Sequence, residues 1–95
     1  MSTYTAPIIA AAQHYSDEQI MDVICILDRD LNGMKDKTGR TAANLRLVRA
    51  AMYELIESRY PWLDAILEAW CESGEDGRGY TQVIADALTA ENVLV

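Results

Sequence analysis

The chain has 95 residues, a length that predicts one domain and leaves little room for a deep enzyme cleft. Apolar residues make up 51% and charged residues 24%, which is the balance of a globular chain and not of a disordered one. The formal net charge of −7 repels phosphate backbones and disfavours nucleic-acid binding. No run of eighteen apolar residues is present, and no basic stretch precedes the apolar residues at 8–12, so neither a membrane span nor a signal peptide is predicted.

The first fifteen residues are ambiguous. Pro7 suits the first turn of a short helix through Ile8 and Gln13, and the same segment also suits a mobile arm. We expect a partly ordered N-terminal arm over 1–15, followed by a single helical domain over 16–95.

A helix is predicted to begin after Ser16. Gln19 follows three residues later, which is the spacing of a capping box. The apolar residues from Ile20 to Leu31 then share one helical face, and Gly33 ends the pattern.

The longest predicted helix spans about 40–59 and is limited by Pro61. Its apolar residues cover an arc of roughly 180°, which is wider than one neighbouring helix covers. We therefore expect this helix to be the central one of the domain.

Two shorter helices are predicted after it, one from Pro61 to about Glu72 and one that begins near Thr81. The core stripe of the first is expected to consist of Leu63, Ile66, Leu67 and Trp70. No apolar–polar alternation typical of strands is present. The predicted fold class is all-α, a small helical bundle of three to four helices with a long central helix at about 40–59.

Residues suited to catalysis or metal binding are few. Cys25 and Cys71 form no C-x-x-C pair, and with the single His14 they do not make a zinc site. No two groups form a recognisable nucleophile–base pair, so we predict no enzyme, no catalytic residue, no metal and no cofactor. Two free thiols are typical of a reducing compartment, and a cytoplasmic location is expected.

Three carboxylates, Asp64, Glu68 and Glu72, repeat every fourth residue and share one edge of the predicted third helix. The edge lacks the Glu-x-x-His pattern of ferritin-like metal sites. We interpret it as a solvated face.

The predicted partner-binding residues are four apolar side chains at the margins of the predicted core: Met21, Cys25, Ile26 and Trp62. A domain this small leaves such side chains uncovered, and Trp is enriched at interface hot spots. We expect a protein partner and a homo-oligomer, most simply a dimer. Residues 33–49 carry a net charge of +4 and residues 54–76 carry −6, so opposite charges would orient the contact.

These features favour a non-enzymatic acidic helical protein that acts by protein–protein interaction, as an inhibitor or modulator of a host protein. Its size and composition are typical of small proteins from bacterial viruses and mobile elements, and no motif adds to that impression.

The alternative function is a binder of small anions or nucleotides. The loop at 33–41 brings Lys35, Lys37, Thr38, Arg40 and Thr41 to the start of the long helix. Free backbone amides and the helix dipole favour an anion at such a position. The loop has neither the spacing nor the preceding strand of a phosphate-binding loop motif.

Overall fold

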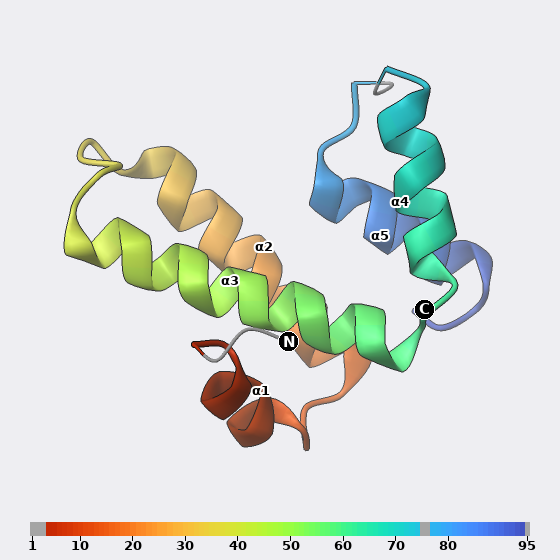
Figure 1. Cartoon of the computed structure of the whole chain (residues 1–95), viewed down its shortest axis with the longest axis horizontal. Helices are drawn as coiled ribbons and strands as arrows, with labels where there is room; N and C mark the ends of the chain where they lie inside the picture. The colour runs from red at the N-terminus through yellow and green to blue at the C-terminus, as the bar shows by residue number, and fades with distance from the viewer. Residues whose placement is uncertain (1–3, 75–76, 95) are drawn as a thin grey trace. The chain divides into compact units, whose positions relative to one another are not determined.

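The computed structural model describes residues 4–74 and 77–94, which contain five helices and no strand (Figure 1). The helices are α1 (Ala6–Ala12), α2 (Asp17–Gly33), α3 (Arg40–Arg59), α4 (Leu63–Glu72) and α5 (Tyr80–Ala90). The predicted all-α class is confirmed. The predicted number of three to four helices is wrong, because the short-helix alternative for the segment around Pro7 is realised as α1.

The chain divides into two compact units, residues 1–56 and residues 57–95. The first unit has seven acidic and six basic residues, a net charge of −1, and the second has eight acidic and two basic residues, a net charge of −6. The acidity of the protein therefore belongs to the second unit. The boundary expected at residue 16 stays a prediction, because packing within a unit does not show which segments fold alone.

Helix α2 begins with reciprocal capping bonds. The backbone N–H of Gln19 donates to Ser16 Oγ at 3.1 Å, and the backbone N–H of Ser16 donates to Gln19 Oε1 at 2.8 Å. These bonds pair two amides that the helix itself leaves without acceptors. The predicted capping box is confirmed.

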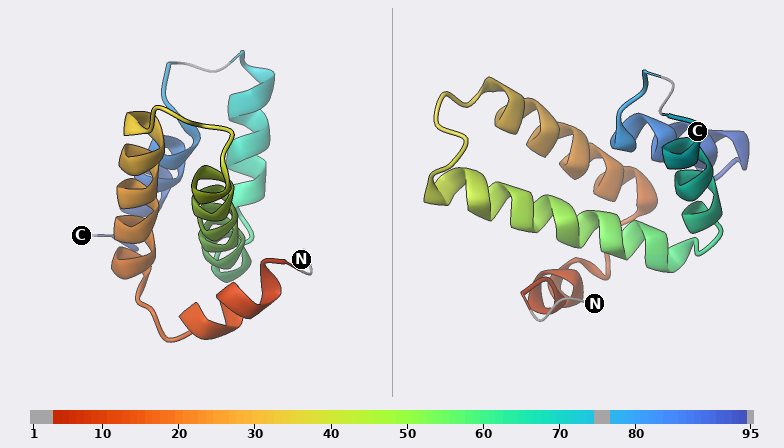
Figure 2. Two further views of the ribbon diagram at one scale, coloured as in Figure 1. Left: turned by 90° about the vertical axis from the view of Figure 1, so that its left-hand side faces the viewer. Right: turned by 45° about the horizontal axis from the view of Figure 1, so that its top comes forward.

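In the first unit, α2 and α3 run antiparallel side by side, and α1 lies across them (Figure 2). An ion pair joins α3 to α2, with Arg49 Nη1 at 2.7 Å from Asp28 Oδ1. A hydrogen bond joins the start of α1 to α3, with Thr5 Oγ1 donating to Glu54 Oε2 at 2.7 Å. The loops between these helices are short enough that sequential neighbours pack together.

The apolar arc predicted for α3 is buried only in part. Leu45, Leu47 and Val48 are half-buried, whereas the buried apolar residues of the helix are Ala42, Ala51, Met52, Leu55 and Ile56. The wide arc thus gives α3 a fully covered C-terminal half and a partly covered N-terminal half.

In the second unit, α4 packs against α5. Leu63 and Leu67 of α4, and Val83, Ile84 and Leu88 of α5, are its buried apolar side chains. Helix α4 begins two residues after Pro61, because the carbonyl of Tyr60 accepts the Leu63 amide in a preceding turn.

Asn92, two residues after the last residue of α5, has a φ of 61°, which places it in the left-handed region. The amide of Val93 donates to the Leu88 carbonyl at 2.8 Å, and the amide of Asn92 donates to the Thr89 carbonyl at 3.1 Å. This is the Schellman pattern, with asparagine at the position that glycine most often takes. No helix among the described residues is long and apolar enough to span a membrane.

Candidate partner-binding surface

Of the three predicted partner-binding residues on α2, one is buried and two are exposed. Met21 is 5% exposed and lies in the core, so its prediction as a surface residue is wrong. Helix α2 buries a face wide enough to include the flank beside Ile24, where Met21 lies. Cys25 and Ile26 are exposed, Ile26 by 46%. Because adjacent residues on a helix point about 100° apart, these two side chains do not form one patch.

The thiol of Cys25 is a weak candidate for a nucleophile. Partial burial raises its pKa above the usual value, and the carboxylates of Asp28 and Asp22 raise it further. A raised pKa keeps the thiol protonated at neutral pH, and the thiolate is the reactive form.

Helix α4 carries an apolar face that points away from its own core. Trp62, which precedes the helix, is 38% exposed, and Ile66 one turn later is 37% exposed. Ala65 and Ala69 are exposed beside them. We call these four residues the α4 stripe.

Helical periodicity predicts Ile66 in the core, and this prediction is wrong, because the side chain is 37% exposed. The residues of the α4 stripe follow one another at i, i+3, i+4 and i+7. In the sequence, this spacing indicates a second apolar face on the helix. The ring of Tyr60 packs edge-to-face on Trp62, with 5.8 Å between centroids, and this contact holds the indole at the helix start.

An open groove of about 480 Å³ lies on another side of α4. Its carboxylates are Glu57, Asp64, Glu68 and Glu72. Leu67, Cys71 and Tyr80 also line it, and none of the described residues that line the groove is basic. The hydroxyl of Tyr80 donates to Glu57 Oε2 at 3.0 Å, which joins α5 to the end of α3 within this unit.

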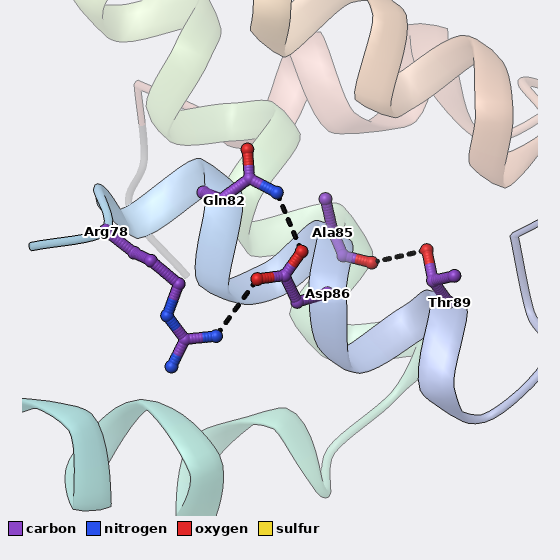
Figure 3. Close-up of polar contacts among 5 residues, drawn as sticks. All are labelled: Arg78, Gln82, Ala85, Asp86 and Thr89. Atoms are coloured by element: carbon purple, nitrogen blue, oxygen red, sulfur yellow. Dashed lines mark hydrogen bonds and ion pairs between the residues drawn. The ribbon is translucent and has the colours of Figure 1, made fainter. Parts of the chain in front are cut away.

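The other three carboxylates of the groove, on Asp64, Glu68 and Glu72, form no ion pair or hydrogen bond with any residue in the described ranges. Arg78, one of the two basic residues of this unit, pairs elsewhere: its Nη1 lies 3.0 Å from Asp86 Oδ2 on α5 (Figure 3). Gln82 donates to the other oxygen of the same carboxylate at 2.7 Å. Asp86 is thus paired locally, whereas the groove keeps its negative charge.

Glu68 and Glu72 separate the groove from the α4 stripe. Both line the groove, and each follows an alanine of the stripe by three residues, which puts it on the neighbouring flank of the helix. We call this pair the acidic ridge. Around α4, an exposed apolar stripe, an acidic ridge and an acidic groove therefore follow one another.

The predicted anion-binding residues of the loop at 33–41 are all exposed: Lys35, Lys37, Thr38, Arg40 and Thr41. The carboxylate of Asp36 already accepts hydrogen bonds from two backbone amides of this loop, those of Thr38 and Gly39. Asp36 Oδ1 accepts both the backbone N–H and the hydroxyl of Thr38 at 3.0 Å. Arg46 donates to the carbonyl of Lys37, so this guanidinium also has a partner within the loop. An incoming anion would compete with Asp36.

Within residues 4–74 and 77–94, no group of three or more His, Cys, Asp and Glu side chains has the geometry to hold a metal ion. His14 is exposed, and its ring packs edge-to-face on Tyr15 with 4.8 Å between centroids. No family model, curated protein or solved structure matches the chain.

Proposed function

We propose that this chain is a non-enzymatic protein-interaction module whose contact surface is the α4 stripe. The observation that carries the proposal is the exposure of Trp62 and Ile66, by 38% and 37%, one helical turn apart on one face. Helix-in-groove contacts use anchors at this spacing, and Trp is enriched among residues that dominate binding energy. The core of the unit does not need this face, because Leu63 and Leu67 are buried on another side of α4.

The expected energy of such a contact is modest. Complete burial of a large apolar side chain contributes about 1.5–3 kcal/mol, whereas association costs about 4–15 kcal/mol in lost freedom of motion. The two large side chains of the stripe therefore support weak binding, and a stable complex needs further contacts around them.

Because a contact at the α4 stripe would cover part of the partner's surface, inhibition or modulation of that partner is the activity that we propose. Cys25 and Cys71 are free thiols, which supports a reducing compartment such as the cytoplasm as the place of this contact.

The test is site-specific photo-crosslinking of the full chain in its source cells. A photoreactive residue replaces Ile66 in one variant and Ala90, an exposed residue of α5, in the control. We expect a discrete covalent adduct from position 66 and none from position 90. The absence of an adduct at position 66, or the same adducts at both positions, would overturn the proposal. An adduct of twice the chain mass would identify a second copy of the chain, which is the expected dimer.

A further inference from the structure

Resting on the proposed function, we infer that the occupant of the α4 stripe is a cationic amphipathic helix of a partner protein. Its apolar face packs on the stripe, and its Lys or Arg side chains pass over the acidic ridge into the groove.

The charge of the second unit supports a cationic occupant. This unit carries a net charge of −6, and Asp64, Glu68 and Glu72 have no partner in the part of the chain that the structure describes. Arg78 pairs with Asp86 on α5. Carboxylates that lack a cation of their own attract a positively charged surface and steer its approach.

The composition of the groove fits the shape of Lys and Arg side chains. Leu67 and Cys71 offer apolar contacts for an aliphatic stem, and the surrounding carboxylates lie where the charged end of that stem would reach. The bond from Tyr80 to Glu57 fixes the carboxylate at one wall of the groove. A volume of about 480 Å³ leaves space for more than one such side chain.

The same charges argue against a symmetric contact between two copies of α4. An isologous interface would bring Glu68 and Glu72 of one copy close to the same residues of the other. Like charges placed opposite one another oppose association. The cationic loop of a second copy, between α2 and α3, offers no apolar helical face to the stripe. It is not helical, and its one large apolar residue, Met34, is half-buried.

The probe is a synthetic helical peptide with Leu at i, i+3, i+4 and i+7 and Lys on both flanks of that face. Two control peptides accompany it: one with Glu in place of every Lys, and one with the cationic composition in scrambled order. Calorimetric titration of the full chain should give binding for the first peptide and affinities at least about tenfold weaker for both controls. Its affinity should fall as salt rises, because exposed charges are screened over about 8–10 Å at moderate ionic strength.

Variants assign the binding to the two parts of the surface. Ile66→Ser removes the large aliphatic side chain of the stripe, and the double variant Glu68→Gln/Glu72→Gln removes the charge of the ridge. Each should weaken the first peptide by about tenfold. The matched control Asp30→Asn/Glu91→Gln removes two exposed carboxylates elsewhere and should leave affinity within about twofold. Circular dichroism confirms that each variant is folded.

The outcomes separate this inference from the proposed function. If Ile66→Ser weakens the peptide and the Gln double variant does not, the cationic occupant is wrong, whereas the stripe remains a contact surface. Equal binding of the scrambled peptide would overturn the amphipathic occupant in favour of charge alone. Failure of the cationic peptide together with self-association in sedimentation equilibrium would replace the occupant with a second copy. Failure of crosslinking at position 66 overturns the proposed function itself.

Discussion

Asp36 shapes the turn that leads into α3. Hydrogen bonds from the backbone amide and the hydroxyl of Thr38, together with the Gly39 amide, hold the pKa of the Asp36 carboxyl below its usual range. A Cβ at position 39 would lie 2.6 Å from Asp36 Oδ2, so glycine there leaves room for the carboxylate. The Asp36 carboxylate and the absence of a side chain at Gly39 therefore both contribute to the conformation of this turn.

We expect Asp36→Asn to lower the melting temperature at neutral pH and to have a smaller effect in acid. Because the folded-state pKa is lowered, the stabilising contribution is present above the unfolded-state pKa and is lost as pH falls through the folded-state pKa. Thermal unfolding of both proteins, from neutral pH to about pH 2, measures the difference. A difference that stays constant over this range would contradict the assignment.

Two glycines near helix ends should respond to alanine in opposite directions. Gly74 has a φ of 83°, where a side chain is strained, so Gly74→Ala should destabilise the chain by about 1–2 kcal/mol. Gly33 ends α2 without a positive φ, and a Cβ there meets no atom within 4 Å. Gly33→Ala should therefore stabilise by about 0.4–1 kcal/mol. Denaturant unfolding measures both changes, and changes of the same sign would refute this account.

At the scale of single elements, α1 depends on its packing. Its 7 residues are too few for a stable isolated helix. Ile9 and Ala12, on its inner face, are 2% and 4% exposed, and the Thr5 side chain bonds to Glu54 on α3. These contacts are long-range in sequence, which is why the local pattern also suited a partly ordered arm.

Ile9→Ala should destabilise the chain by about 2–4 kcal/mol, because the substitution leaves a cavity under α1. Ile8→Ala is the matched control: Ile8 is half-buried at the edge of an apolar cavity of about 180 Å³, so the loss should be smaller. Chemical denaturation of the two variants compares the losses. Equal and negligible losses would mean that α1 is not part of the folded core.

At the scale of the whole molecule, charge is concentrated where binding is proposed. Asp64, Glu68 and Glu72 repeat at i, i+4 and i+8 on α4, and like charges at this spacing destabilise a helix. The second unit, with a net charge of −6, therefore carries more electrostatic self-repulsion than the first, whose net charge is −1. Binding surfaces often keep such locally unfavourable features, at a cost in stability.

Glu68→Gln/Glu72→Gln should stabilise the chain at low salt by about 0.2–0.5 kcal/mol for each like-charge pair removed. The gain should shrink at about 1 M salt, where charges are screened within about 3 Å. Thermal unfolding of wild type and variant at both salt concentrations provides the comparison. A gain that is absent at low salt, or that does not change with salt, would show that repulsion on α4 is not the cause.

Local sequence signals determined the helices themselves. Ser16 and Gln19 predict the start of α2, the pattern at 40–59 predicts α3 with the bounds that the structure has, and the predicted end of α4 at Glu72 is confirmed. Each of these signals depends on residues within a few positions of one another. Capping and helical periodicity act over that range, so the sequence alone carries them.

Only the tertiary structure decided which faces of those helices are covered. Periodicity shows that Leu63, Ile66 and Leu67 lie near one another around α4, and packing in the second unit buries the two leucines and leaves Ile66 exposed. The groove likewise joins Glu57, from the end of α3, with Tyr80, 23 residues later in α5. A helical pattern specifies which residues share a face, whereas the choice between two apolar faces depends on contacts between segments distant in sequence, which no local signal encodes.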